Sequence, residues 1–223
     1  SKYMKIKCSS IFKTYHISET RDVINDLSFE LDTANSLALY GPSGVGKSTL
    51  LNILSGLDNP DRGEIIYNDI CFTDLSDTEK ISFRLEHISH VFQTPNLLQD
   101  FNVIENIMLP MRYKGISKKK SREIAMGCLE EVGCQEHATS SVTTLSGGEA
   151  QRVGIARAMA KSSKIIFADE PTGNLDNENS KVVIDNLINI CKSKSITLIV
   201  VTHDENIISK TSNSMKMLDG KIT

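Results

Sequence analysis

Short apolar runs alternate with longer amphipathic segments along most of the chain. Largely apolar runs occupy residues 37–40, 164–168 and 196–202, and each is followed by glycine or a polar residue. Apolar runs of this length are typical of strands that are buried on both faces, as in a parallel sheet. Because amphipathic segments separate these runs, the pattern predicts an α/β fold with a parallel sheet.

The N-terminal third contains further strand candidates, whereas the middle of the chain has mainly helical spacing. Additional strands are expected at residues 5–12, 22–31, 64–68 and 88–92. Apolar residues at every third or fourth position predict helices at residues 47–57, 104–112, 118–132, 149–160 and 178–192. We therefore expect a central helical block that is inserted into the sheet.

Composition excludes several classes of protein. The 25 basic and 28 acidic residues give a net charge of -3, so the chain as a whole does not attract nucleic acid or an anionic membrane. Its 5 cysteines include no C-x-x-C pair, which favours neither a zinc site nor a disulfide framework and fits a reducing cytosol. No apolar run approaches the roughly 20 residues that span a bilayer, and residues 1–8 are too polar for a signal peptide. The basic run at residues 117–123 is expected to be a solvated helix start.

Residues 41–49, with the sequence GPSGVGKST, match the pattern G-x-x-x-x-G-K-[ST] and lie between an apolar strand and a helix. Glycines allow successive N–H groups to turn toward phosphate oxygens, and the helix start adds its positive end. Lys47 is expected to reach the β- and γ-phosphates, and Ser48 to offer its hydroxyl to Mg²⁺. The residues predicted to bind a nucleoside triphosphate here are Gly41, Pro42, Ser43, Gly44, Val45, Gly46, Lys47, Ser48 and Thr49.

Two acids follow the predicted strand at residues 164–168. In a parallel sheet the last side chains of a strand reach the carboxyl edge, where ligands bind in open α/β folds. Asp169 is therefore expected to hold Mg²⁺ beside Ser48. Glu170 is then placed to orient or deprotonate the water that attacks the phosphate.

Two further polar residues follow predicted strands. His203 comes after the run at 196–202 and is expected near the γ-phosphate, where an imidazole stabilises developing charge. Gln93 follows the strand at 88–92, and its amide oxygen is a weaker candidate for binding Mg²⁺ or water.

The segment 145–160, with the sequence LSGGEAQRVGIARAMA, combines a helix start with two glycines. Ser146 can cap the helix and Glu149 can reach back to the Ser146 amide, an arrangement known as a capping box. Gly147 and Gly148 lower the stability of a first helical turn, so their presence indicates that a ligand approaches the backbone.

The order of these motifs resembles the nucleotide-binding domain of an ATP-binding cassette (ABC) transporter, over essentially the whole chain. The resemblance rests on the loop at 41–49, Gln93, LSGGE at 145–149, IIFADE at 165–170, GNLD at 173–176 and His203. It implies a P-loop NTPase (RecA-like) core with a parallel sheet, an antiparallel β subdomain and an inserted α-helical subdomain. Within the single domain 1–223, the core and β subdomain are expected at 1–92 and 162–223, and the helical subdomain at 93–161.

The resemblance also implies roles for individual residues. Tyr15 matches the aromatic residue that stacks on adenine. Gln93 matches the residue that links the γ-phosphate and Mg²⁺ to the helical subdomain and the membrane partner. Glu170 matches the catalytic base, His203 the switch histidine, and Asp176 the acid that crosses the dimer interface. The implied catalytic residues are Glu170, His203, Lys47 and Gln93, and the implied Mg²⁺ ligands are Ser48, Gln93 and Asp169.

Ser146, Gly147 and Gly148 match the signature that binds the γ-phosphate of the ATP held by the opposite subunit. The chain contains one phosphate loop and one signature, so the resemblance implies a head-to-tail dimer with two ATP molecules at its interface. This branch of the family usually forms homodimers, and a paired cassette is the alternative. Hydrolysis removes the γ-phosphate contact and allows the dimer to open.

The resemblance implies an integral membrane permease as a separate partner, and no nucleic acid. The chain is then peripheral to the membrane, at the cytoplasmic face of a bacterial-type inner or plasma membrane. The segment 94–110 is rich in Leu, Ile and Met and lies where the family docks a helix of its permease. We interpret it equally as a docking surface and as core of the helical subdomain.

Shorter motifs resemble one branch of the family. They are VFQ at 91–93, NLL at 96–98, VIEN at 103–106 and PTGNLD at 171–176. The branch contains lipoprotein-releasing ATPases (LolD), macrolide and peptide exporters (MacB) and cell-division ATPases (FtsE). Lipoprotein release or export of macrolides or antimicrobial peptides is expected, and the alternative is a regulatory ATPase that signals through a membrane partner to cell-wall hydrolases. The sequence has neither sustained heptads nor a second cassette, which opposes DNA-repair and translation-associated relatives.

Two short stretches depart from the family pattern. Glu149 stands where the family usually has Gln, and its carboxylate repels a phosphate unless it is turned away or satisfied by amides. Asn35 and Ser36 replace the usual Gly-Glu, and Asn tolerates a left-handed turn better than other non-glycine residues.

Overall fold

A six-stranded sheet forms the centre of the fold in the computed structural model, which describes residues 3–16, 20–31 and 36–223. The strands lie in the order β10-β9-β3-β8-β7-β6, and all neighbours are parallel except the β10–β9 pair. Their bounds are β3 (Ser36–Tyr40), β6 (Ile88–Phe92), β7 (Ile165–Asp169), β8 (Thr197–Val201), β9 (Asn213–Leu218) and β10 (Lys221–Ile222). The parallel sheet expected from the apolar runs is therefore present.

A second sheet consists of antiparallel strands in the order β2-β1-β4-β5. Its bounds are β1 (Ile6–His16), β2 (Thr20–Leu31), β4 (Arg62–Tyr67) and β5 (Ile70–Cys71). The predicted first strand, at 5–12, is shorter than β1. The pairing of β1 with β2 shifts register between Cys8 and Ile11 and again toward Thr14, and such bulges let a strand continue where strict alternation fails.

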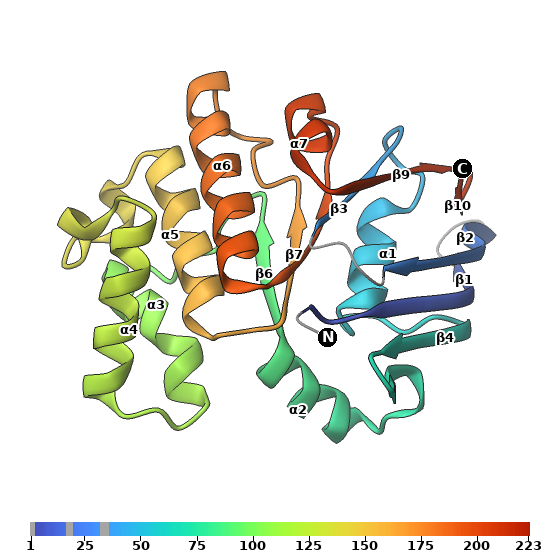
Figure 1. Cartoon of the computed structure of the whole chain (residues 1–223), viewed down its shortest axis with the longest axis horizontal. Coiled ribbons are helices and arrows are strands. Elements are labelled where there is room, and N and C mark those ends of the chain that lie inside the picture. Colours follow the sequence, from blue (N-terminus) through green and yellow to red (C-terminus); the bar gives the residue numbers. More distant parts are fainter. Residues whose placement is uncertain (1–2, 17–19, 32–35) are drawn as a thin grey trace.

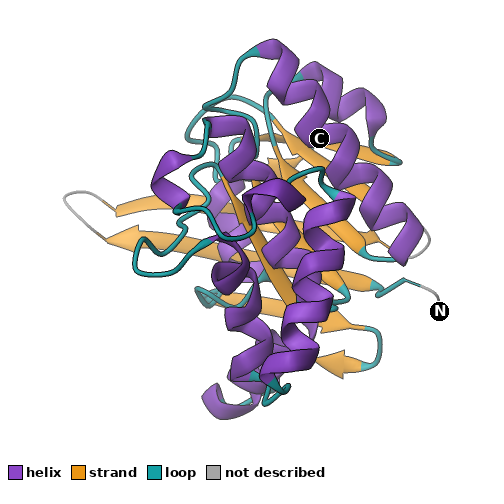
Figure 2. Cartoon of the chain, turned by 90° about the vertical axis from the view of Figure 1, so that its left-hand side faces the viewer, coloured by secondary structure: helices purple, strands orange, loops and turns teal. Residues whose placement is uncertain are grey.

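The helices fall into two groups. Those along the sheets are α1 (Lys47–Leu54), α2 (Asp77–His87), α6 (Asn177–Lys194) and α7 (Glu205–Lys210). A block at one end of the molecule, opposite the antiparallel sheet, contains α3 (Val103–Tyr113), α4 (Lys118–Glu131) and α5 (Gly147–Ala160), as Figure 1 shows. Short 3-10 helices are η1 (Phe72–Asp74), η2 (Gln135–His137) and η3 (Val142–Thr144). In Figure 2 the helical end faces the viewer and its helices lie in front of the strands.

The central strands are buried on both faces, as their continuous apolar sequences require. In β7, Ile165 and Phe167 join a hydrophobic cluster with α1 and the antiparallel sheet. The alternate residues Ile166 and Ala168 join a second cluster, with α5 and α6. Each face of the parallel sheet therefore packs against a different layer of the protein.

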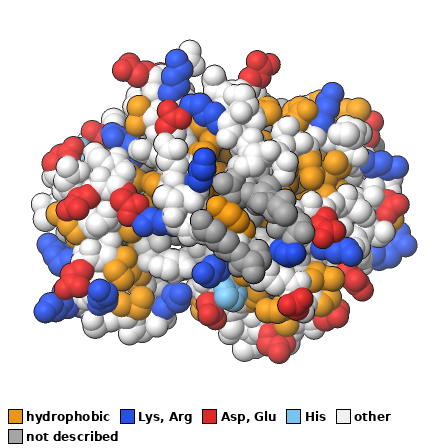
Figure 3. All heavy atoms as spheres, viewed as in Figure 1, with side chains coloured by type: hydrophobic (Ala, Val, Ile, Leu, Met, Phe, Trp, Pro, Cys, Tyr) orange, Lys and Arg blue, Asp and Glu red, His pale blue; other side chains and the backbone are white. Residues whose placement is uncertain are grey.

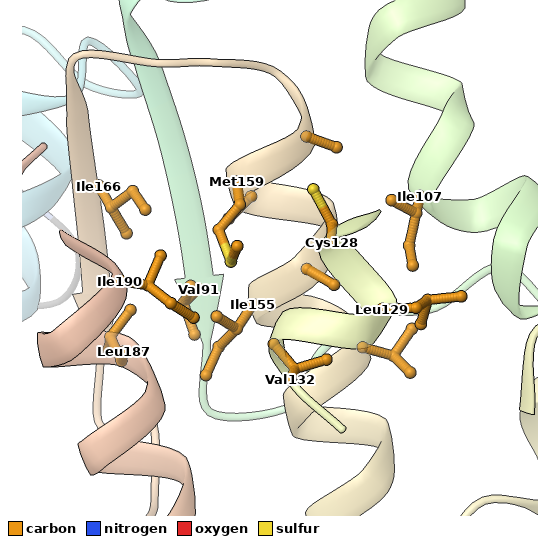
Figure 4. Close-up of a cluster of buried hydrophobic side chains, with 14 of the residues drawn as sticks. Val91, Ile107, Cys128, Leu129, Val132, Ile155, Met159, Ile166, Leu187 and Ile190 are labelled. Atoms are coloured by element: carbon orange, nitrogen blue, oxygen red, sulfur yellow. The ribbon is translucent and has the colours of Figure 1, made fainter. Parts of the chain in front are cut away.

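The second cluster also attaches the helical block to the sheet. Figure 4 shows Met159 and Ile155 of α5 between Ile166 of β7 and the side chains of α4. The cluster continues through Leu129 of α4 to Ile107 of α3. Because these side chains form one contiguous core, the block is held to the sheet by apolar packing.

The sequence did not predict the helices α2 and α7, the strands β5, β9 and β10, or the three short 3-10 helices. In α2 only Phe83 is buried, so the apolar periodicity that marks a helix is weak. The start of α2 is fixed instead by a capping box between Ser76 and Glu79.

The helix predicted at 47–57 ends earlier, at Leu54. Gly56 has a φ of 72°, a left-handed conformation in which α-helices commonly stop. The turn predicted at Asn35 lies outside the described residues, and the division of the chain at residues 93 and 162 stays a prediction.

Candidate functional site

The loop between β3 and α1 contains glycines in conformations that other residues avoid. Gly41 and Gly46 have φ values of 148° and 99°. A Cβ on Gly41 would lie 2.2 Å from Met217 O, and one on Gly46 would lie 2.7 Å from Val23 O. A side chain at either position would therefore displace neighbouring backbone. The loop has the strand–loop–helix context that the sequence predicts.

Lys47 is the first residue of α1, and its side chain folds back over this loop. Its Nζ donates to Gly41 O at 2.9 Å and to Pro42 O at 2.8 Å. These bonds satisfy an ammonium group on a residue that is only 9% exposed. A pocket of about 260 Å³ adjoins the lysine, and it is lined by Tyr15, Val23, Gly44, Gly46, Lys47, Ser48 and Thr49.

Tyr15 is held at this pocket by a network that the sequence analysis missed. Its hydroxyl donates to Asp58 Oδ2 at 2.7 Å, and Lys13 Nζ donates to Asp58 Oδ1 at 2.9 Å. Burial and the Asp58 carboxylate raise the pKa of Tyr15, so the phenol stays protonated and remains a donor. The loop that follows α1 thereby fixes the aromatic ring of β1.

Ser48 and Asp169 meet at the carboxyl edge of the parallel sheet. Ser48 Oγ donates to Asp169 Oδ1 at 3.3 Å. Burial raises the pKa of Asp169, and the charge of Glu170 adds to this, while Ser48 and Lys47 oppose it. The carboxylate of Asp169 is therefore less favourable here than in water, and a cation beside it would stabilise it.

Glu170 lies directly after β7 in a left-handed conformation, with a φ of 44°. Its N–H donates to Val201 O at 2.8 Å, which ties the residue to the end of β8. Its Oε2 lies 2.9 Å from Nδ1 of His203, whose side chain is 76% exposed. The ends of the adjacent parallel strands β7 and β8 thus bring a carboxylate and an imidazole together, a pairing that the sequence does not predict.

Gln93 lies directly after β6 and contacts the segment after β7. Its Nε2 donates to Asn174 Oδ1 at 3.1 Å. A Cβ on Gly173 would lie 2.5 Å from the same nitrogen, so a side chain at this position would shift the Gln93 amide. A cavity of about 570 Å³ adjoins Gly173 and His203 and extends between α6 and α7.

The first turn of α5 contains the capping box that the sequence predicts. Ser146 N donates to Glu149 Oε2 at 2.8 Å, and Glu149 N donates to Ser146 Oγ at 3.3 Å. The start of α6 packs closely against this turn, since a Cβ on Gly148 would lie 2.5 Å from Asn179 Oδ1. Asp176 caps α6 by accepting from Asn179 N at 2.8 Å. The structure thus groups Ser146, Gly148 and Asp176, and none of the three lines the pocket beside Lys47.

No helix among residues 3–16, 20–31 and 36–223 is long and apolar enough to cross a membrane. Across the same described ranges, no three His, Cys, Asp or Glu side chains are grouped so that they could hold a metal ion.

Comparisons with known proteins identify a family and several relatives for this chain. Residues 24–173 match the family described as ABC transporter. The chain is 38% identical to the lipoprotein-releasing system ATP-binding protein LolD of Syntrophus aciditrophicus, over 97% of this chain and 98% of the relative. It is 40% identical to the protein of the same name from Treponema denticola, over 96% and 95% of the two chains. The dimeric post-hydrolysis structure of the ATP-binding cassette MJ0796 bound to ADP and Pi matches with a TM-score of 0.89 and 33% identity, over 97% of this chain and 96% of that chain.

A parallel sheet with a glycine-rich, lysine-bearing loop between strand and helix defines a nucleotide-binding protein of the P-loop class. Within this class, the chain belongs to the ABC transporter family. It is the ATP-binding subunit of such a transporter and an ATPase. The fold class predicted from the sequence is confirmed by the match to the solved cassette.

Proposed function

We propose that this chain powers lipoprotein release by a separate membrane permease, through ATP-driven dimerisation. The observation that carries the proposal is the identity of 38% and 40%, over nearly whole chains, to two proteins named for lipoprotein release. These relatives favour lipoprotein release over drug or peptide export and over signalling to cell-wall hydrolases. With the permease as its anchor, the chain would lie at the cytoplasmic face of a bacterial inner membrane.

ATP would bind along the pocket beside the phosphate loop. The ammonium group of Lys47 would exchange the carbonyl oxygens of Gly41 and Pro42 for oxygens of the β- and γ-phosphates. N–H groups of the loop and the start of α1 would bind the remaining phosphate oxygens. Tyr15 lines the same pocket as Ser48, so its ring is available to stack on adenine.

The donor atoms beside the loop suit Mg²⁺. The Ser48 hydroxyl and the Asp169 carboxylate are oxygen ligands, and they already lie in hydrogen-bond contact. A bound cation would offset the burial and the charge of Glu170 that raise the pKa of Asp169. Gln93 uses its nitrogen on Asn174, so its amide oxygen is the atom that would bind the cation. Mg²⁺ would neutralise phosphate charge as the bond to the γ-phosphate breaks.

Glu170 would accept the proton of the attacking water, or orient that water toward the γ-phosphate. His203 lies 2.9 Å from this carboxylate and would stabilise the charge that develops on the phosphate oxygens. The water-derived hydroxide forms the new bond to phosphorus, and ADP leaves with the electrons of the broken bond.

The first turn of α5 would bind the γ-phosphate of an ATP held by a second subunit. Ser146 N and Glu149 N are engaged in the capping box, whereas no hydrogen bond in the described part of the chain engages the N–H groups of Gly147 and Gly148. Two free amides at a helix start attract a phosphate, but the turn has no lysine of its own. Asp176, which caps the adjacent helix, would lie at the same subunit interface.

The permease would dock beside the helical block. Within the segment 94–110, Val103, Ile104 and Ile107 are fully or almost fully buried, so the core interpretation holds for them. Leu98 and Phe101 are instead 50% and 37% exposed and are available for a partner. Acidic and basic side chains are interspersed on the face shown in Figure 3, which fits a protein partner better than nucleic acid.

Purification of the chain with its membrane partner from native membranes tests the proposal. A partner with a large extracytoplasmic domain and bound lipoprotein is expected. A partner loaded with a drug or peptide, or one bound to a cell-wall hydrolase, would contradict lipoprotein release. Replacing Leu98 and Phe101 by Ser should release the partner, whereas the matched change of the exposed Ile70 on β5 should not.

A further inference from the structure

His137 contacts the one residue of the signature that departs from the family pattern. It ends η2, the short helix in the connection from α4 to α5. Its Nε2 lies 3.2 Å from Oε1 of Glu149, in the first turn of α5, and 3.5 Å from Oε1 of its neighbour Glu136. The imidazole therefore lies against the carboxylate beside the two free signature amides.

The two oxygens of Glu149 have separate partners. Oε2 accepts from Ser146 N at 2.8 Å, and Oε1 is the atom that faces His137. The hydrogen bonds from Ser146 lower the pKa of Glu149, and the charges of His137 and Arg152 lower it further, so the residue carries its full negative charge. The orientation of the Glu149 carboxylate is therefore set by contacts to both of its oxygens.

Other charged groups around the pair have different attachments. Arg152, one turn further along α5, donates to Val132 O at 3.3 Å and so is anchored to the end of α4. Glu136 lies next to His137 on η2, and its side chain is 61% exposed. The side chains of His137 and Glu149 are each 27% exposed, so solvent screens the interaction between them less than it screens the interaction between His137 and Glu136.

We propose that His137 is a positioning residue for the signature: it holds the Glu149 carboxylate on Ser146 N and away from the phosphate site, so that the N–H groups of Gly147 and Gly148 can donate to the γ-phosphate of an ATP held by a second subunit. The inference rests on the proposed dimer function. Without His137, Oε1 loses its partner and the carboxylate is free to turn toward the bound phosphate, which it repels. A glutamine at position 149 carries no charge and has no need of the imidazole.

The test is a double-mutant cycle in the Glu170→Gln protein, with the dimer dissociation constant in ATP and Mg²⁺ measured by sedimentation equilibrium. A partly exposed contact between an imidazole and a carboxylate contributes about 1.4- to fivefold in affinity, and each dimer contains two such contacts, so His137→Ala should weaken dimerisation by about two- to 25-fold. Glu149→Gln should change it less than about twofold, and the double variant should equal Glu149→Gln. Glu136→Gln is the matched control and should behave as the parent.

Charge and packing are separated by two further variants. His137→Arg supplies a permanent cation and should restore dimerisation to within about twofold of the parent, whereas the uncharged donor in His137→Gln should restore it only in part. Equal losses from His137→Ala in the parent and in the Glu149→Gln variant would show that the histidine merely packs, and no loss in either would show that the contact is idle. Both results would overturn the inference.

ATP affinity of the monomer and its melting temperature verify that each variant is folded. A Glu170→Gln parent that stays monomeric in ATP would instead overturn the dimer function, and the inference with it.

Discussion

Oε2 of Glu170 lies 2.9 Å from Nδ1 of His203, so two residues that follow neighbouring parallel strands form one acid–imidazole pair. The backbone fixes this pair, because Glu170 N donates to Val201 O at 2.8 Å. The carboxylate is less exposed than the imidazole, at 22% against 76%. The protein therefore orients the carboxylate before any substrate binds, which lowers the entropic cost of positioning a water.

Glu170→Gln should lower the rate of ATP hydrolysis by about 10²- to 10⁴-fold, because the amide cannot accept the proton of the attacking water. ATP binding should persist, since the side chain keeps its shape, and ATP should accumulate in a stable dimer. Phosphate release and gel filtration in ATP and Mg²⁺ measure the two effects. The exposed Glu130 of α4 offers a control, and Glu130→Gln should hydrolyse ATP normally. A Glu170→Gln protein that hydrolyses ATP normally and stays monomeric would contradict the role of the base.

Lys47→Ala should lower ATP affinity by about 100-fold or more, since each hydrogen bond from a charged group contributes about 1.5–3 kcal/mol. The ammonium group now binds Gly41 O and Pro42 O, and it would bind phosphate oxygens in the complex. Isothermal titration calorimetry measures the affinity, with the exposed Lys118→Ala as the control. If a folded Lys47→Ala protein binds ATP with undiminished affinity, the loop at 41–49 does not bind the nucleotide.

Ser146→Arg should leave ATP affinity of the monomer within about twofold of wild type and abolish ATP-driven dimerisation. The change removes the cap of α5, at a cost of about 1 kcal/mol, and places a long side chain over the free amides. The chain supplies a matched control, because Ser76 and Glu79 form the same capping box on α2. Ser76→Arg should cost similar stability and spare dimerisation, as measured by melting and gel filtration. If Ser146→Arg instead lowers the ATP affinity of the monomer, the signature contacts the nucleotide of its own subunit, and the assignment to the opposite subunit is wrong.

Asp58→Ala should raise KM for ATP by about five- to tenfold with little change in kcat, because Tyr15 loses the acceptor that fixes its ring. Steady-state phosphate release gives both parameters. Asp58→Asn retains an acceptor and should lie close to wild type, and the exposed Asp74→Ala should be unchanged. An equal fall in kcat and kcat/KM would show instead that Asp58 acts on the chemical step.

The sequence predicts the features whose partners are near in the chain. The phosphate loop, the acids after β7 and the capping box of Ser146 and Glu149 each depend on residues within about one turn or strand end, so their pattern can be read locally. The parallel sheet follows from runs that are apolar throughout, because only strands buried on both faces need them.

Contacts between residues that are far apart in the chain leave no such local pattern in the sequence. Asp58 lies 43 positions from Tyr15, and Asn174 lies 81 positions from Gln93. The helix α2 was missed for a related reason, since it buries only Phe83 and is marked by its cap rather than by periodicity. His137 is near Glu149 in sequence, but an intervening turn brings them together, and no spacing rule predicts that contact.

His90 should make the stability of the fold depend on pH. Burial lowers the pKa of His90 to about 4, helped by Lys161 and Arg84, and the ring stacks on Phe92 with a centroid distance of 5.3 Å. Its buried Nδ1 has no hydrogen-bond partner within the described ranges. The imidazole is therefore held neutral in the native protein.

The sign of the effect follows from proton uptake by the unfolded chain, in which a histidine titrates near pH 6.5. Above this pH both states are neutral and the contribution to unfolding free energy is complete. As pH falls from 6.5 to 4 only the unfolded chain gains the proton, so stability drops by up to about 3 kcal/mol from this residue. His90→Phe keeps the stacked ring without the proton, and urea unfolding at pH 7, 5.5 and 4.5 should give a shallower slope than wild type. An equally steep slope in His90→Phe would assign the acid sensitivity to other groups.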